Sequence, residues 1–84
     1  MNNKQRKILE EIFKKPTPSD IRWDDIEMLF KYLEAEVIFG KGSRVRIKLN
    51  GLKSSFHRPH PQKITDKGTV VSIRRFLENA GVKL

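Results

Sequence analysis

The sequence contains no cysteine, few aromatic residues and no long apolar segment. The absence of cysteine excludes disulfides and thiolate metal sites. The longest uncharged apolar run, residues 37–39, is far shorter than the roughly 20 residues that a membrane helix requires. The N-terminus, residues 1–4, lacks the apolar region of a signal peptide. At 84 residues the chain is also too short for a Rossmann domain or a (β/α)₈ barrel. We therefore expect a single cytoplasmic domain over residues 1–84.

Acidic residues are scarce in the second half of the chain. Residues 1–39 have a net charge of −1, whereas residues 40–84, with 11 basic and 2 acidic side chains, have a net charge of +9. This asymmetry predicts a localised surface that binds nucleic acid. Asp66 is the only acid between residues 37 and 77, which argues against a two-metal carboxylate nuclease. We expect no metal and no cofactor, so any chemistry on RNA would use side chains alone.

Hydrophobic periodicity predicts an α+β fold with three helices and three strands. Prolines at 16 and 18 end the first helix, and residues 1–20 form an extra N-terminal helix and linker before a core of residues 21–84. A three-stranded antiparallel sheet needs helices on one face to bury its apolar side chains. The predicted order, α-α-β-β-β-α, corresponds to helices at 4–14 and about 23–34, strands at 36–39, 44–49 and 52–57, and a helix at about 69–79.

The strongest strand signal lies in residues 44–49, where basic and apolar residues alternate. Asn50-Gly51 follows, a pair that favours a two-residue type I′ turn. Such a turn sets the register of the hairpin and puts the polar side chains of both strands on one exposed face. That face is predicted to contain Arg44, Arg46, Lys48, Lys53, Ser55 and His57.

The same register places His57 opposite Arg44. Because a neighbouring cation favours the neutral imidazole, which can accept a proton, His57 is a candidate general base. The plainer alternative is a solvated histidine on a basic sheet. Lys48 faces Lys53. This like-charge pair either binds a phosphate or prevents another chain from pairing with the edge of the sheet. The full set of predicted RNA-binding residues is Lys41, Ser43, Arg46, Lys48, Lys53, Ser55 and Arg58.

Other motifs give no site. The histidines at 57 and 60 lack cysteine partners and have Pro59 and Pro61 beside them, so we expect no zinc site. Because the exposed face offers no aromatic residue apart from His57, stacking of bases is weakly supported. We therefore expect binding to follow backbone shape and charge, with little sequence preference.

Several short segments together resemble the HicA family of toxins from HicA–HicB toxin–antitoxin modules. The resemblance covers about residues 22–82, and His60 followed nine residues later by Thr69 also fits it. It implies a double-stranded-RNA-binding-domain-like fold, metal-independent cleavage of mRNA, and neutralisation by a HicB-like antitoxin. The segments that carry it are Trp23-Asp24-Asp25-Ile26-Glu27, Gly42-Ser43, the short hairpin, Ser72-Ile73 and Ala80-Gly81.

The chain departs from the family at one important position. The family usually has a catalytic His after its Gly-Ser, whereas this chain has Arg44. We therefore predict a transposed site, in which His57 acts as the acid/base and Arg44 contacts the scissile phosphate. Two alternatives remain open: cleavage through His60, which falls on the second His position of the family, or an inactive module that only binds RNA or an acidic protein.

Overall fold

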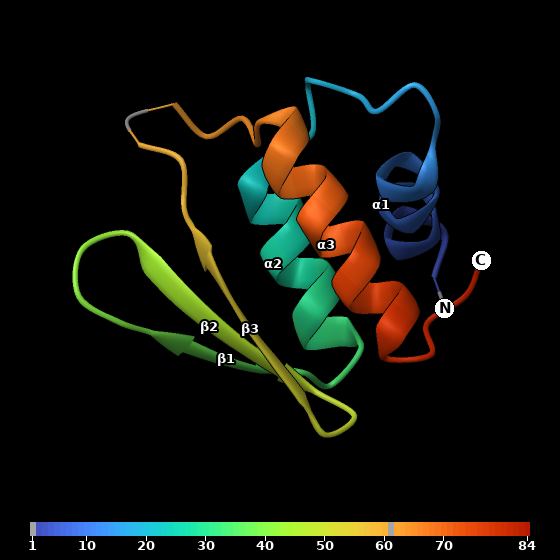
Figure 1. The fold of residues 1–84 in the computed structure, drawn as a ribbon. Coiled ribbons are helices and arrows are strands. Elements are labelled where there is room, and N and C mark those ends of the chain that lie inside the picture. The colour runs from blue at the N-terminus through green and yellow to red at the C-terminus, as the bar shows by residue number, and fades with distance from the viewer. Residues whose placement is uncertain (1, 61) are drawn as a thin grey trace.

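The computed structural model describes residues 2–60 and 62–84. It confirms the predicted α+β fold, with three helices and one three-stranded antiparallel sheet in the order α-α-β-β-β-α (Figure 1). The elements are α1 (Asn3–Phe13), α2 (Trp23–Tyr32), β1 (Glu36–Phe39), β2 (Arg44–Leu49), β3 (Leu52–His57) and α3 (Lys67–Asn79).

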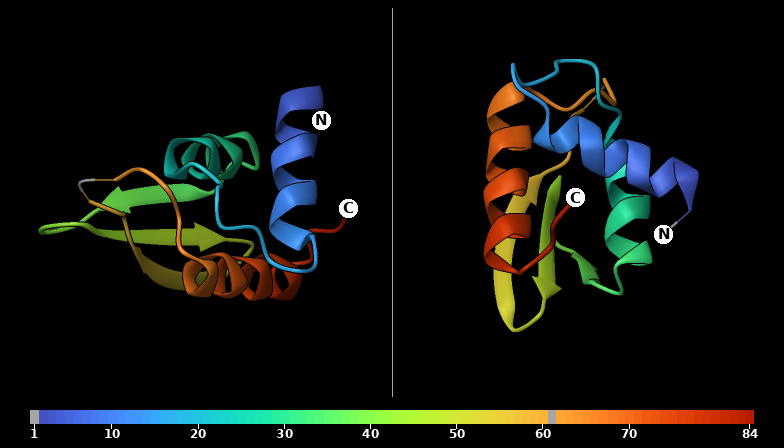
Figure 2. Two further views of the ribbon diagram at one scale, coloured as in Figure 1. Left: turned by 90° about the horizontal axis from the view of Figure 1, so that it is seen from above. Right: turned by 90° about the vertical axis from the view of Figure 1, so that its right-hand side faces the viewer.

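The elements form three layers. The sheet, with strand order β1-β2-β3, packs against α2 and α3, and α1 covers the other side of these two helices (Figures 1 and 2). The helices therefore cover one face of the sheet. We call the uncovered face the open face.

The β2–β3 hairpin has the predicted register. Arg44 pairs with His57 at one end and Leu49 pairs with Leu52 at the other. Asn50 and Gly51 have φ angles of 51° and 82°, as a type I′ turn requires. Burial alternates strictly along β2, so the apolar side chains face the helices and the basic ones face outward.

Two helix ends differ from the prediction. Helix α2 ends at Tyr32, not Glu34, because Glu34 has a φ of 65° and the Ala35 amide donates to the Phe30 carbonyl. These features form a Schellman motif with an unusual non-glycine residue in the left-handed position. Helix α3 begins at Lys67, two residues before the predicted start, with Asp66 at the N-cap position; the Asp66 carboxylate accepts from the Thr69 hydroxyl and not from a backbone amide.

Aromatic rings join the sheet to the helical layer. Phe56 of β3 lies 6.4 Å from Phe30 of α2 and 6.0 Å from Phe76 of α3, measured between ring centroids. Such contacts add to the area that the rings bury. Two other aromatic residues, Tyr32 and Phe39, are 42% and 50% exposed.

Arg74 attaches α1 to the rest of the protein. Its buried side chain donates from Nε to the Ile12 carbonyl at 2.8 Å and from Nη2 to the Lys14 carbonyl and the Thr17 hydroxyl at 3.1 and 3.0 Å. These bonds satisfy carbonyls at the end of α1 that have no partner within the helix. This cation therefore has a structural role away from the open face.

Candidate functional site: the open face and an adjoining cleft

The open face presents the polar set predicted from the hairpin register. All six positions are exposed, and Arg44 is paired directly with His57 across β2 and β3. Paired side chains on one face of an antiparallel sheet have Cβ atoms about 4.5–5.5 Å apart. The face therefore places the His57 and Arg44 side chains at directly adjacent positions. Its members are Arg44, Arg46, Lys48, Lys53, Ser55 and His57.

Strand β1 adds two side chains to this face that the hairpin alone does not reveal. Glu36 pairs with Lys48 and Ile38 pairs with Arg46. The Glu36 carboxylate lies 3.7 Å from the Lys48 ammonium. This ion pair offsets part of the repulsion between Lys48 and Lys53, so the like-charge pair is weaker evidence for a phosphate site than the hairpin alone indicates.

The basic residues of residues 40–84 do not all lie on the open face. Of the 11 in residues 40–84, four lie on the open face. Arg74 holds α1, and Arg58 and Lys63 line a separate cleft. The open face is therefore a modest cationic surface rather than a strongly basic one.

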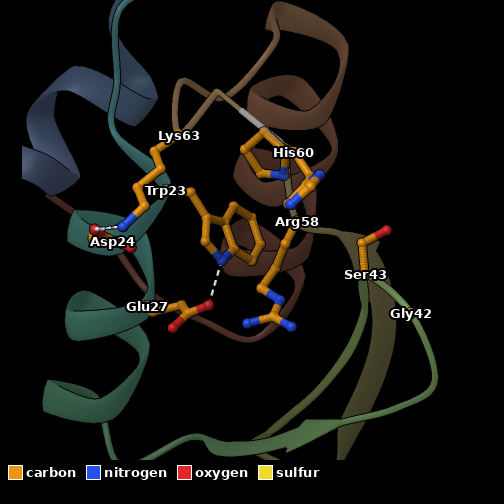
Figure 3. A pocket seen from close by; sticks show the side chains of 9 residues that line it. Trp23, Asp24, Glu27, Gly42, Ser43, Arg58, His60 and Lys63 are labelled. Atoms are coloured by element: carbon orange, nitrogen blue, oxygen red, sulfur yellow. Dashed lines mark hydrogen bonds and ion pairs between the residues drawn. The ribbon is translucent and has the colours of Figure 1, made fainter.

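The cleft lies at the end of the sheet where β2 begins and β3 ends. The chain after β3 returns to the start of α2, where Ile64 pairs with Arg22 and the Trp23 amide donates to the Lys63 carbonyl at 2.8 Å. Beside this pairing, an open cleft of about 610 Å³ lies between α2, the β1–β2 turn and the segment after β3. Figure 3 shows the residues that line it: Trp23, Asp24, Glu27, Gly42, Ser43, Arg58, Pro59, His60 and Lys63.

Groups of both charges face this cleft. On the α2 side, Glu27 accepts a hydrogen bond from the Trp23 indole nitrogen, and Asp24 lies 3.8 Å from the Lys63 ammonium. On the other side, the Arg58 guanidinium lies 4.9 Å from the centre of the Phe39 ring, within range of a cation–π contact. The cleft therefore offers hydrogen-bond acceptors on one wall and donors on the other.

The structure divides the predicted site residues into two groups. His57 and Arg44 are together on the open face, whereas His60 lines the cleft with Ser43 and Arg58. Lys41 is exposed in the turn between β1 and β2. The two histidines thus occupy different environments. Among the described residues, no three His, Asp or Glu side chains converge as a metal-binding group.

Residues 23–82 match the family described as HicA toxin of bacterial toxin–antitoxin. The chain belongs to the HicA toxin family. The match begins within one residue of the region identified by the sequence resemblance and leaves α1 outside it. Comparisons with curated proteins and with solved structures gave no match.

This HicA chain brings several residues to the cleft that the sequence reasoning did not select. The sequence places Trp23, Asp24 and Glu27 at the start of a helix and in a segment that resembles the family, but it assigns them no role in a site. One signal in the sequence does point to Asp24 and Glu27. They are three residues apart and therefore lie on the same side of the helix, and they are charged, so that side is not expected to pack in the core. Their proximity to Arg58 and His60 depends on the pairing of Arg22 with Ile64, which no local pattern predicts.

In the described part of the chain, every helix is too short or too polar to cross a membrane.

Proposed function

We propose that this HicA-family protein is a metal-independent endoribonuclease that cleaves mRNA in the cytoplasm. The observation that carries the proposal is the pairing of His57 with Arg44 on an exposed cationic face. Arg44 stands where the resemblance expects a catalytic His, and an imidazole is supplied directly across the strand pair. Membership of a toxin family supports a growth-arresting activity of this kind.

In the proposed reaction, a ribose 2′-hydroxyl attacks the adjacent phosphorus. His57 accepts the 2′-hydroxyl proton as the bond between phosphorus and the 2′-oxygen forms. Arg44 stabilises the negative charge that develops on the non-bridging oxygens. The bond from phosphorus to the 5′-oxygen then breaks, and this oxygen takes a proton from water. The imidazolium of His57 gives its proton to the hydroxide that remains, which regenerates both the water and the neutral base. The products are a 2′,3′-cyclic phosphate and a 5′-hydroxyl end.

The remaining cations of the open face would hold the RNA backbone. Arg46 and Lys53 have no ion-pair partner among the described residues, whereas Lys48 is engaged by Glu36. Arg and Lys bind phosphates without reading the base. The predicted contacts of Lys41, Ser43, Ser55 and Arg58 with RNA would supplement this positioning.

The proposed partner protein is a HicB-like antitoxin. A protein that silences the site must cover exposed cations, so its contact surface should be acidic. The helices of this chain lie on the other side of the sheet (Figure 2), which leaves the open face accessible to such a partner.

The test is cleavage of a labelled RNA by purified protein in the presence of EDTA. The proposal predicts 2′,3′-cyclic phosphate ends, resistance of the same sequence made with 2′-deoxyribose, and loss of cleavage in His57→Ala. Unchanged cleavage by His57→Ala would overturn the assignment of His57. The alternative function, RNA binding without chemistry, is favoured by the replacement of the usual His with Arg44. It predicts salt-sensitive RNA binding with no cleavage by the wild-type protein.

A further inference from the structure

The cleft adjoins the proposed catalytic pair. Ser43 precedes Arg44 and Arg58 follows His57, and the Arg58 amide donates to the Ser43 carbonyl at 2.7 Å. Ser43 and Arg58 line the cleft, whereas Arg44 and His57 belong to the open face. Successive residues of a strand are only about 3.3 Å apart. Successive side chains point to opposite faces of a sheet, so an RNA strand whose phosphate contacts Arg44 on the open face must pass around this end of the sheet to place a neighbouring nucleotide at the mouth of the cleft.

The chemistry of the cleft suits a neutral polar group better than a phosphate. Asp24 and Glu27 lie on the α2 wall, and their carboxylates would repel a second phosphate. An ionised carboxylate only accepts hydrogen bonds, whereas a guanidinium only donates them. A ligand that fits between Glu27 and Arg58 must therefore present donors on one side and an acceptor on the other.

Arg58 provides a second observation. Its Nε is buried and makes no hydrogen bond with any residue that the structure describes. Buried donors are normally paired, and an unpaired one is costly. The Phe39 ring holds the guanidinium in place at 4.9 Å. The guanidinium of Arg58 is therefore positioned before a ligand arrives.

We propose that the cleft binds an unpaired guanine base of the RNA substrate, next to the phosphate held by Arg44. Among the four RNA bases, only guanine has two adjacent N–H donors, at N1 and N2, beside a carbonyl acceptor at O6. Glu27 accepts from the two donors, and Arg58 donates to the carbonyl. Enzymes that act on single-stranded nucleic acid read a displaced base through this edge. The inference rests on the proposed function for its RNA substrate, and it replaces the expectation of little sequence preference.

The only tryptophan of the chain, Trp23, lines the cleft and reports its occupancy. The experiment uses the full chain carrying His57→Ala, so that RNA is not cleaved, and five-nucleotide RNAs of sequence UUXUU. Binding is followed by the fluorescence of Trp23 and, independently, by the anisotropy of a 5′ label. The RNA with X = G should bind about tenfold more tightly than those with A, C or U.

Variants then assign this preference to the cleft. Adding Glu27→Gln should bring the four affinities within twofold of one another, because the amide places a donor opposite the base donors. Glu10→Gln, the same chemical change on exposed α1, should preserve the preference for G. Arg58→Lys, which removes the planar donor group, is the second variant and should also reduce the preference. Circular dichroism establishes that each variant is folded.

Equal binding of the four RNAs, or a preference for G that survives both Glu27→Gln and Arg58→Lys, would overturn the inference. Its failure is separable from that of the proposed function, which is read from cleavage by the wild-type protein. RNA cleavage without base preference would leave the endoribonuclease standing and remove the guanine site. Selective binding without cleavage would leave the guanine site on a protein that binds RNA but does not cut it.

Discussion

The open face and the cleft meet at the same end of the sheet but differ in shape and chemistry. The open face is an exposed sheet surface, with four cations and the single carboxylate of Glu36. The cleft is concave, combines carboxylates with cations, and contains a buried tryptophan. Exposed cations attract any polyanion, whereas fixed donors and acceptors discriminate among ligands. If the proposed function holds, the comparison assigns a different task to each region: the open face holds the RNA backbone and the cleft selects a base.

The largest effect is expected when each of the two histidines is replaced by alanine in turn. Removing a general base costs roughly 10²–10⁴-fold in rate, so His57→Ala should reduce single-turnover RNA cleavage by that factor. His60→Ala, the matched change in the cleft, should reduce it less than tenfold. Rates measured at saturating protein separate chemistry from binding. The opposite ranking would move the catalytic site from the open face into the cleft.

Arg44 offers the second test of where the chemistry lies. Loss of one group that stabilises the developing charge costs about 10²–10³-fold, so Arg44→Ala should lower the cleavage rate by about 10²-fold. Arg44→Lys should recover part of the loss because it keeps the charge without the planar donors. The measurement is the same single-turnover assay.

A double variant tests the same hypothesis through a gain of cleavage activity, which general damage to the protein cannot produce. Arg44→His combined with His57→Ala puts an imidazole at the position where the family resemblance expects one. We expect cleavage to exceed that of His57→Ala alone. If the double variant stays as inactive as His57→Ala, the two positions are not equivalent and the transposition hypothesis loses its support.

The open face depends on the turn that fixes its register, and a stability measurement tests that dependence. The Asn50 side chain donates to the Ala80 carbonyl at 2.7 Å, and its backbone has a φ of 51°. Asn50→Ala removes the hydrogen bond and strains the backbone, so it should lower the free energy of unfolding by about 1–3 kcal/mol. Asn50→Gly keeps the backbone conformation and should cost less. Urea unfolding measures both, and equal losses would show that the left-handed conformation contributes nothing.

The open face was predictable from the sequence because its information is local. Alternation along residues 44–49 and the Asn50-Gly51 turn determine which side chains share a face. The cleft was not predictable, since it joins α2, the β1–β2 turn and the segment after β3 through the pairing of Arg22 with Ile64. Glu36 was missed for a related reason. The register of β1 on β2 depends on a four-residue turn whose geometry the glycines at 40 and 42 leave open.

The smallest predicted effect is on the salt dependence of RNA binding, and it separates the two regions by their contact with phosphate. Each phosphate contact contributes about −0.7 to the slope of log K against log salt concentration for single-stranded RNA. Arg46→Gln removes an open-face cation, so the slope should become shallower by about 0.7 and affinity at 0.1 M salt should fall about fivefold. Lys63→Gln removes the same charge from the cleft, where the Lys63 ammonium already lies 3.8 Å from the Asp24 carboxylate. The Lys63→Gln slope should stay within about 0.2 of wild type. Equal slope changes in the two variants would mean that phosphates enter the cleft as well, and the division between backbone binding and base selection would not hold.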